Sequence, residues 1–345
     1  KDIKDSIFFC LHGDNFDGNK FAHSALDKKA AYVIIDDKEF LIKDDSRIIL
    51  VDDTLETLQQ LANYHRKQFT IPIIGITGTN GKTTTKELIN VVLKKKYTVT
   101  STLGNFNNHI GVPLTLLQLS PKSEIGIIEM GANHPDEIEF LCKIAEPTLG
   151  IITNIGKAHL EGFGSLDTIK RTKLALYRSV KGSKGLLFVN GDDELLTKES
   201  AGIETLLYGM SSNNGVFGQV INEFPFLELE WSLQNQNKSN SIASKLFGRY
   251  NFTNIMAAVA VGNYFDITPD NISLAIASYL PTNNRSQFIK GNNNELIMDA
   301  YNANPASLEI ALANFHQDQH PNKACILGDM FELGQYALEE HNKVL

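Results

Sequence analysis

The sequence contains few cysteines, and their placement excludes two common kinds of site. Only three occur in 345 residues, Cys10, Cys142 and Cys325, and they lie far apart. No two have the spacing of metal ligands, and an odd number argues against a disulfide framework. Inert thiols in a reducing compartment are the expected state, which predicts a cytoplasmic protein.

Long apolar runs and an excess of positive charge are also lacking. No apolar stretch approaches the roughly 18 residues that a membrane-spanning helix needs. The formal net charge is −8, so nothing predicts a nucleic-acid-binding surface. We therefore expect no membrane span and no nucleic-acid partner, and we expect a monomer.

The first 69 residues have the pattern of a small α/β domain. Apolar strands alternate with amphipathic helices: strands are expected at 6–11, 31–36 and 47–53, and helices at 21–30 and 54–69. Thr54 is the expected N-cap of the second helix. Thr57 then stands where a capping box would prefer glutamate.

From residue 70 the alternation becomes more regular. Apolar, β-branched strands are expected at 71–78, 97–102, 124–131, 149–156 and 185–190, with helices at 82–96, 134–145 and 165–180. Strands that alternate with helices predict a doubly wound, mostly parallel sheet. Residues 215–247 alternate in polarity and predict an antiparallel insertion. Two helices follow, at 251–265 and 272–280, and complete a central domain at 70–284.

A third α/β unit starts at residue 285. Its expected elements are a strand at 295–300, a helix at 305–315 and a strand at 323–329. The chain begins without methionine and stops inside an apparent helix, "YALEEHNKVL". We therefore expect a fragment with an incomplete first domain (1–69) and a truncated third domain (285–345).

The stretch "GITGTNGKTTTKEL" (75–88) has the chemistry of a phosphate-binding loop, although Ile76 stands where the usual P-loop has its first glycine. It lies at a strand-to-helix junction, the context in which such a loop acts. Glycines let the backbone approach phosphate oxygens, and the helix N-terminus adds N–H groups and a positive dipole end. Lys82 would supply a cation to the terminal phosphates, and Thr83 a hydroxyl to Mg²⁺. The residues predicted to bind ATP here are Gly78, Thr79, Asn80, Gly81, Lys82, Thr83 and Thr84. A glycine turn with a solvated lysine is the simpler alternative, which the strand-loop-helix context disfavours.

"TGTNGKTT" resembles the ATP loop of the Mur ligases and folylpolyglutamate synthases. Four further stretches narrow the resemblance: "GNFNNHIGVPLTLL" (104–117), "EMGANHPDEI" (129–138), "TNIGKAHLEGFGS" (153–165) and "DAYNANPASLEIAL" (299–312). With "ILGDMFELG" (326–334), they resemble the Mur ligases that add D-alanyl-D-alanine to UDP-N-acetylmuramoyl-tripeptide. The resemblance covers nearly the whole chain and implies an N-terminal UDP-sugar domain, a central ATPase domain and a C-terminal Rossmann-like domain.

The resemblance implies a two-step reaction that belongs to peptidoglycan precursor synthesis. A carboxylate of the UDP-N-acetylmuramoyl-tripeptide attacks the γ-phosphate of ATP and gives an acyl phosphate and ADP. The amine of D-alanyl-D-alanine then attacks the carbonyl carbon and expels phosphate. Because two anions approach each other, the site must neutralise charge.

Besides Thr83, three side chains are candidates for magnesium binding. Glu129 ends an apolar strand beside the phosphate loop, where a Mg²⁺ ligand belongs in an open α/β sheet; an exposed strand-end glutamate is the alternative. His159 corresponds by resemblance to a ligand of a second Mg²⁺. Lys173 corresponds to the lysine that many members carbamylate, although Ala175 stands where the family often has glutamate.

The remaining candidates follow from the resemblance. Asn107 or Asn108 is expected to face the γ-phosphate or the substrate, and the sequence does not choose between them. Asn251 and Asn254 correspond to the adenine-side asparagines, with Tyr250 where histidine is usual. The other expected contacts are Arg285 and Asp299 to ATP, Asn302 and Asn304 to the dipeptide, and the 11–21 loop, with Asn19 where histidine is frequent, to the UDP-sugar.

Two other functions remain open at this point. Folylpolyglutamate synthase is an amide ligase of the same superfamily, but it would not carry "GNFNNHIG" or "DAYNANP". A non-catalytic nucleotide-binding module is the alternative from another class, because the missing termini would permit ATP binding without turnover.

Overall fold

The computed structural model describes residues 3–42, 44–234, 236, 238–282, 284–317 and 320–344. Contacts divide the chain into two compact units, Lys1–Gln68 and Phe69–Leu345. Each unit has a hydrophobic core of its own. None of the helices that the described residues form is long and apolar enough to cross a membrane.

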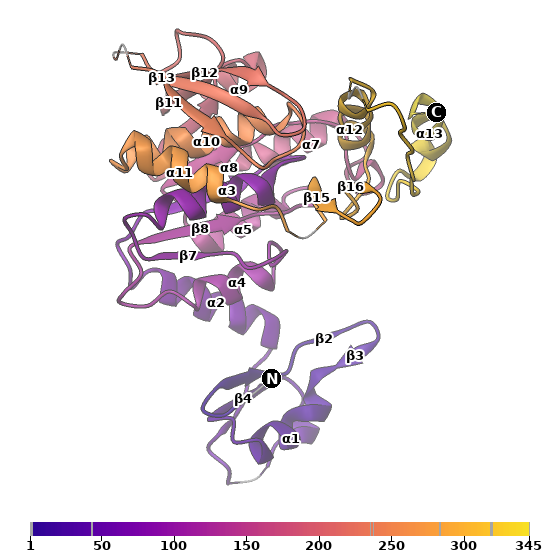
Figure 1. Cartoon of the computed structure of the whole chain (residues 1–345). Helices are drawn as coiled ribbons and strands as arrows, with labels where there is room; N and C mark the ends of the chain where they lie inside the picture. Colours follow the sequence, from indigo (N-terminus) through magenta and orange to yellow (C-terminus); the bar gives the residue numbers. More distant parts are fainter. Residues whose placement is uncertain are drawn as a thin grey trace. The chain divides into compact units, whose positions relative to one another are not determined.

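The N-terminal unit is a small parallel sheet with helices, as predicted (Figure 1). Its strands, in the order β1-β4-β5, are β1 (Ile7–Phe9), β4 (Tyr32–Ile35) and β5 (Ile48–Leu50). A short hairpin, β2 (His12–Gly13) and β3 (Phe16–Asp17), leads into the 3₁₀ turn Gly18–Phe21 and α1 (Ala22–Asp27). A second 3₁₀ turn, Lys38–Phe40, precedes β5, and α2 (Thr54–Arg66) closes the unit.

The prediction that Thr54 caps α2 is wrong by one residue. The N-cap is Asp53, whose carboxylate accepts a hydrogen bond from the Glu56 backbone N–H at 2.7 Å. Aspartate caps as well as threonine does, and Glu56 then occupies the third helical position that a capping box favours. The buried hydroxyl of Thr54 donates instead to the Cys10 carbonyl oxygen at 3.1 Å, which ties α2 to the end of β1.

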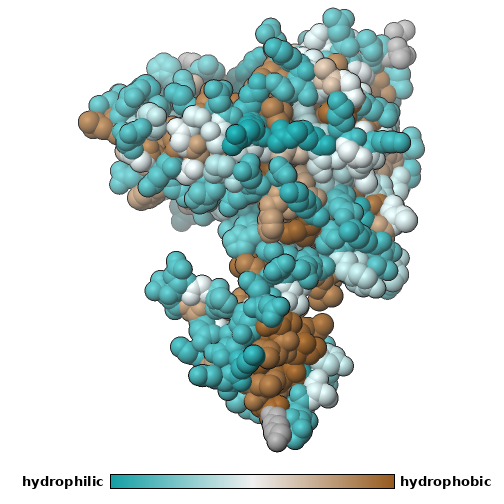
Figure 2. All heavy atoms as spheres, turned by 180° about the vertical axis from the view of Figure 1, so that it is seen from behind, coloured by the Kyte–Doolittle hydropathy of each residue, from teal (hydrophilic) through white to brown (hydrophobic). Residues whose placement is uncertain are grey.

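One face of the small sheet is apolar and exposed at three positions, although Ile34 on the same face is buried. The strand register places Ile7, Tyr32 and Ile49 on the same face, and their exposed fractions are 48%, 47% and 42%. Figure 2 shows apolar side chains gathered over this unit. The opposite face, with Val33 and Ile48, packs into the core against α1.

The second unit is built on a nine-stranded sheet with the order β14-β13-β12-β11-β10-β9-β6-β8-β7. Its strands are β6 (Ile73–Thr77), β7 (Val99–Ser101), β8 (Ile125–Glu129), β9 (Leu149–Ile152), β10 (Leu186–Asn190), β11 (Glu204–Gly209), β12 (Val216–Asn222), β13 (Glu228–Leu233) and β14 (Asn240–Ala243). Pairing is parallel from β7 to β12 and antiparallel from β12 to β14. The predicted mostly parallel sheet is confirmed, and the predicted antiparallel segment extends that same sheet.

Helices cover both faces of this sheet, as a doubly wound fold requires (Figure 1). Ile74 and Ile76 of β6 point into a core shared with α3 (Lys82–Leu93) and α10 (Asn251–Tyr264). Gly75 between them faces α8 so closely that an added Cβ would lie 2.8 Å from Leu176. The remaining helices are α4 (Gly111–Leu116), α5 (Glu137–Ala145), α6 (Leu160–Phe163), α7 (Leu166–Lys173), α8 (Ala175–Gly182), α9 (Glu194–Glu199) and α11 (Pro269–Ser278). The single helix predicted over 165–180 is therefore two, α7 and α8, which meet at Leu174.

After residue 285 the chain forms a hairpin and helices. These are β15 (Gln287–Lys290), β16 (Glu295–Met298), α12 (Pro305–Gln317), the 3₁₀ turn Gly334–Tyr336 and α13 (Ala337–Val344). The strand predicted at 323–329 is wrong: these residues form no strand, and Ile326 is 96% exposed. A strand needs a neighbour for its backbone groups, and within the described ranges no strand pairs with this stretch.

Candidate active site

The loop between β6 and α3 depends on two glycines. Gly81 has a φ of 79° and is the N-cap of α3; a Cβ there would lie 2.5 Å from the amide oxygen of Asn254. Gly78 has a φ of 150°, and a Cβ there would collide with the side chain of Thr153. Only glycine fits at these two positions, so the backbone of the loop packs tightly against Thr153 and Asn254 at the N-terminus of a helix.

Lys82 closes over this loop. Its ammonium group donates to the carbonyl oxygens of Gly78 at 2.8 Å and Thr79 at 2.9 Å. The pKa of Lys82 is lowered to about 8, chiefly by burial; the charge of Glu129 opposes this shift, and the charge of Arg285 contributes to it. At neutral pH the group is a cation held at the position where a phosphate tail would reach the loop.

The end of β9 supports the other side of the loop. Asn154 accepts from the Asn80 N–H through its amide oxygen, and its amide nitrogen donates to the Asn80 carbonyl oxygen, both at 3.0 Å. The Thr153 hydroxyl donates to the same carbonyl at 2.6 Å. The Thr79 hydroxyl donates to the Gly156 carbonyl oxygen at 3.1 Å. Sequence reasoning assigned no role to Asn154, although "TNIGKAH" lies at the strand end beside the loop.

Glu129 ends β8 next to the loop and is fully buried. One of its carboxylate oxygens accepts from the Thr83 hydroxyl at 3.1 Å and from the Asn107 amide nitrogen at 2.8 Å. The second oxygen is buried without a hydrogen-bond partner among the described residues. The nearest cation, the Lys86 ammonium, lies 3.8 Å from this oxygen and leaves its hydrogen-bonding capacity unused. The arrangement fits Mg²⁺, which prefers a few carboxylate and hydroxyl oxygens together with phosphate and water.

The structure separates the two asparagines that the sequence left undivided. Asn107 points to Glu129, and its side chain is so close to Gly131 that a Cβ there would lie 2.9 Å from the amide carbon. Asn108 instead accepts from the N–H groups of Ile110 and Gly111, at 3.1 and 2.9 Å. Asn107 therefore lies at the site, and Asn108 shapes the turn before α4.

Lys173 and His159 lie near the same loop. Lys173 ends α7, is almost fully buried and donates to the Gly78 carbonyl oxygen at 3.0 Å. Burial, and then the charge of Lys82, holds its pKa well below the ordinary value. His159 has a left-handed backbone, and its Nδ1 contacts the carboxylate of Glu332. Burial also lowers the pKa of His159, against the opposing effect of Glu332.

Few side chains of the kinds that usually bind metal ions lie together in this site. Within the described ranges no group of three or more histidine, cysteine, aspartate or glutamate side chains could hold a metal ion. A site here would thus combine Glu129 with the Thr83 hydroxyl and with groups that the substrate brings.

Asn251 and Asn254 lie behind the loop on α10 and hydrogen-bond to each other at 2.9 Å. Asn251 also donates to the Phe247 carbonyl oxygen, and Asn254 accepts from the Thr85 hydroxyl at 3.0 Å. Both side chains are buried. In this structure they brace the Gly81 turn, while Thr84 lies partly exposed on the first turn of α3.

Of the C-terminal candidates, Asn304 contacts the loop, and Arg285 lies near enough for its charge to lower the pKa of Lys82. Asn304 donates to the amide oxygen of Asn80 at 2.9 Å, so the start of α12 touches the loop. The Arg285 guanidinium lies 3.6 Å from the centre of the Tyr301 ring, and its buried Nε has no hydrogen-bond partner among the described residues. Asp299 accepts from the Ser286 N–H at 3.2 Å, and Asn302 is exposed.

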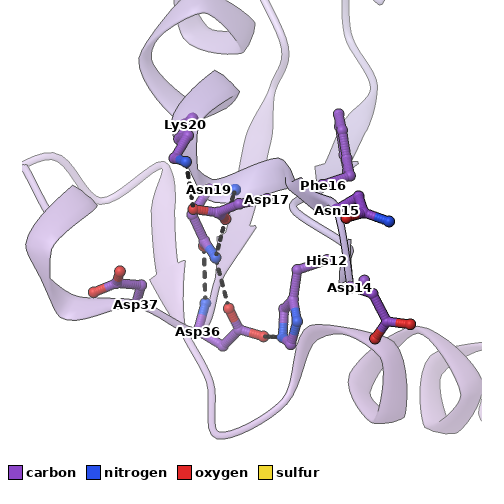
Figure 3. A pocket seen from close by; sticks show the side chains of 10 residues that line it. His12, Asp14, Asn15, Phe16, Asp17, Asn19, Lys20, Asp36 and Asp37 are labelled. Carbon is purple, nitrogen blue, oxygen red and sulfur yellow. Dashed lines mark hydrogen bonds and ion pairs between the residues drawn. The ribbon is translucent and has the colours of Figure 1, made fainter.

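The N-terminal unit carries a separate open cavity of about 550 Å³ around the β2–β3 hairpin (Figure 3). Asn19 forms part of its wall and donates to Asp17 at 3.2 Å and to Asp36 at 2.8 Å. The other oxygen of Asp36 lies 3.0 Å from His12 Nε2. The predicted loop 11–21 thus shapes a polar cavity.

Comparison with known proteins agrees with this geometry. Residues 76–262 match the Mur ligase middle domain, and residues 284–345 match the Mur ligase glutamate ligase domain. The chain is 37% identical over 336 residues to the UDP-N-acetylmuramoyl-tripeptide–D-alanyl-D-alanine ligase of Bacillus subtilis, covering 97% of this chain and 72% of that protein. The enzyme of the same name from Escherichia coli is 30% identical over 332 residues, covering 95% of this chain and 72% of that protein.

Solved structures give the same result. MurF from Acinetobacter baumannii superposes with a TM-score of 0.88 at 29% identity, over 99% of this chain and 75% of that one. MurF ligase from Thermotoga maritima, solved in complex with ADP, gives 0.87 at 29% identity, over 99% and 79%. The chain therefore belongs to the Mur ligase family, among the UDP-N-acetylmuramoyl-tripeptide–D-alanyl-D-alanine ligases.

Proposed function

We propose that this protein joins D-alanyl-D-alanine to UDP-N-acetylmuramoyl-tripeptide, with ATP converted to ADP and phosphate, in peptidoglycan precursor synthesis. The observation that carries the proposal is the arrangement at Glu129, where the Thr83 hydroxyl and the Asn107 amide meet one carboxylate oxygen beside the Lys82 loop. These residues belong to the motifs in which the chain resembles relatives of that activity. We also propose a monomeric, cytoplasmic enzyme.

The loop and its neighbours would bind and orient the nucleotide. Backbone N–H groups at the start of α3 and the Lys82 ammonium receive the phosphate tail. Asn107 offers an amide without adding charge. Arg285 and Asp299 bring further polar groups from the C-terminal segment, and the buried, unpaired guanidinium nitrogen of Arg285 supports a role toward an anion. The positive groups among these, the Lys82 ammonium, the Arg285 guanidinium and the helix N–H groups, lower the repulsion between the substrate carboxylate and the γ-phosphate.

Mg²⁺ would be held by Glu129 and Thr83 at one position, and by His159 and a carbamylated Lys173 at a second. When bound, the metal ions neutralise the phosphate oxygens and those of the developing acyl phosphate. The orphan oxygen of Glu129 supports the first position. His159 contacts Glu332 through Nδ1 in this structure, so a metal ion at the second position would take Nε2, with Glu332 orienting the ring.

Carbamylation of Lys173 is chemically reasonable in this setting. Because burial and the charge of Lys82 hold the pKa of Lys173 well below the ordinary value, more of it is present as the nucleophilic neutral amine than in an exposed lysine. The amine's lone pair attacks the carbon of CO₂, one carbon–oxygen π pair moves to oxygen, and the nitrogen loses a proton. The product is an anion that would relieve the crowding of Lys173 with Lys82 and could bind a metal ion.

For the dipeptide and the UDP-sugar, the proposal assigns a region of the chain rather than a set of contacts. Asn302 is exposed on the segment before α12, and we assign it to the dipeptide. Asn304 was predicted to face the dipeptide too, but its amide nitrogen lies against Asn80, and this contact favours a role between dipeptide and nucleotide. The polar cavity beside Asn19 and His12 is assigned to the UDP-sugar.

A phosphate-release assay on the full-length protein tests the proposal. Release is expected only when ATP, UDP-N-acetylmuramoyl-tripeptide and D-alanyl-D-alanine are all present. Release with folate and glutamate would indicate a folylpolyglutamate synthase. ATP hydrolysis that is indifferent to both amide substrates, or ATP binding without turnover, would indicate a nucleotide-binding module.

A further inference from the structure

Lys86 is a buried cation for which the proposed reaction provides no task. It lies one turn into α3 and is fully buried, among the largest side chains with no exposed surface. A lysine is almost never buried unless partners compensate its charge. Its surroundings therefore indicate what the ammonium group does.

The ammonium of Lys86 joins three parts of the site. It donates to the carbonyl oxygens of Thr102 at 2.8 Å and Gly104 at 3.3 Å, at the start of the loop that leads to Asn107. It lies 2.9 Å from a carboxylate oxygen of Glu87. The second carboxylate oxygen of Glu129 is 3.8 Å away, at ion-pair rather than hydrogen-bond distance.

That second oxygen of Glu129 is the one without a hydrogen-bond partner. Its sister oxygen is already occupied by Thr83 and Asn107. Lys86 thus neutralises Glu129 from one side without occupying the lone pairs of the free oxygen. The same ammonium also fixes the loop that carries Asn107, because it binds the Thr102 carbonyl oxygen. Thr102 in turn holds the backbone of Glu129, since its hydroxyl accepts from the Glu129 N–H at 3.0 Å.

We propose that Lys86 is a positioning residue for the magnesium–nucleotide complex: it holds Glu129 and the 102–107 loop in the geometry that leaves one carboxylate oxygen free for Mg²⁺. The inference rests on the proposed nucleotide site and adds a residue to it. Because Lys86 is fully buried, its effect on a bound nucleotide would pass through Glu129 and the loop rather than through direct contact.

The test measures ADP binding by calorimetry with and without Mg²⁺, on the full-length protein. The readout is the factor by which Mg²⁺ tightens ADP binding. Lys86→Met removes the charge and the donors while it keeps an unbranched chain, and this factor is expected to fall about ten- to a hundredfold, the usual cost of losing an outer-shell partner. Metal-free ADP affinity is expected to stay within about twofold, because the phosphate loop itself is unchanged.

A matched control is Lys95→Met, which changes an exposed lysine just past the same helix. It is expected to leave both affinities unchanged. If Lys86→Met weakens ADP binding equally with and without Mg²⁺, or not at all, the proposal is overturned. A parent protein that does not respond to Mg²⁺ overturns the proposed function as well, whereas a responsive parent with an equally responsive Lys86→Met overturns the role of Lys86 alone.

Should Lys86→Met not fold, Lys86→Arg and Lys86→Gln decide the question. Arginine retains a cation near Glu129, while glutamine retains a donor for the Thr102 carbonyl without the charge. Magnesium dependence is expected to persist in the arginine variant and to be lost in the glutamine variant. Equal Mg²⁺ dependence in these two variants contradicts a role for the charge.

Discussion

The amide nitrogen of Asn304 donates to the amide oxygen of Asn80 at 2.9 Å, although the two residues are 224 positions apart. The hydrogen bond joins the start of α12 to the phosphate loop. Asn304 is further fixed by Ser307, whose N–H donates to its amide oxygen at 2.9 Å. Asn304 thus links the C-terminal segment directly to the position of the phosphate loop.

Asn304→Ala is expected to raise the KM for ATP about two- to tenfold, because one hydrogen bond contributes roughly 0.5–1.5 kcal/mol. The KM for D-alanyl-D-alanine should change less. Steady-state kinetics with each substrate varied in turn would measure both. Asn302→Ala, on the exposed neighbour, is expected to show the reverse pattern; equal effects of both variants on one substrate would contradict the assignment.

Lys82→Ala is expected to abolish ATP-dependent phosphate release, because the terminal phosphates lose their fixed cation. The protein should still fold, since the Lys82 side chain hydrogen-bonds only to loop carbonyls among the described residues. Lys94→Ala, on an exposed lysine at the end of α3, is the matched control. Near-normal turnover of Lys82→Ala would refute the assignment of the loop.

The pKa of Lys82, lowered from its ordinary 10.5 to about 8 by burial, predicts a linked proton. A bound phosphate tail raises this pKa again, so above pH 8 the lysine takes up a proton when ADP binds. ADP affinity should therefore be constant below about pH 8 and fall as the pH rises above it. Calorimetry at pH 8.5 in two buffers of different ionisation enthalpy would show proton uptake in the parent and none in Lys82→Ala.

Gly81→Ala is expected to destabilise the loop, because the φ of 79° strains an alanine and its Cβ would meet Asn254. The left-handed conformation alone costs about 1–2 kcal/mol, which corresponds to a fall in Tm of about 2 °C or more. Gly182→Ala is the control, because a Cβ there meets no atom within 4 Å. Thermal unfolding that shows the same Tm for both variants would contradict this reading of the turn.

Carbamylation predicts that turnover depends on dissolved CO₂. Removal of bicarbonate should lower the rate of phosphate release, and its return should restore it, because the neutral Lys173 amine reacts with CO₂. Enrichment with ¹³C-labelled bicarbonate should give a carbamate signal that Lys173→Ala lacks. Lys170 lies on the same helix as Lys173 and forms an ion pair with Glu199 of α9. Lys170→Ala should therefore keep both the carbamate signal and the response to bicarbonate.

The sequence predicted those parts of the site that depend on local order along the chain. The Gly78–Lys82 loop needs a strand before it and a helix after it, and both have strong local patterns. Glu129 was found for the same reason, because it ends an apolar strand. The strand at 323–329 was predicted on equal grounds and is absent, because a strand also requires a neighbour that the local pattern cannot supply.

The sequence could not predict the direction in which the side chains of Asn107, Asn108 and Lys86 point. Asn107 and Asn108 are adjacent and chemically identical, and only the turn before α4 decides that one faces Glu129 and the other caps the backbone. Lys86 could not be found by pattern either, since a lysine four positions after Lys82 in a helix is usually a solvated surface residue. Its burial depends on the fold of the loop at 102–104, which is distant in sequence.

The carbonyl oxygen of Gly78 accepts from two lysines at once, Lys82 at 2.8 Å and Lys173 at 3.0 Å. Two charged ammonium groups at one oxygen would repel each other, and burial and the charge of Lys82 accordingly hold the pKa of Lys173 well below its ordinary value. The ligand-free site is thus electrostatically frustrated. Negative charge that arrives there, from a triphosphate or from a carbamate, relieves the repulsion between the two lysines. This relief contributes to the free energy with which the site binds anions.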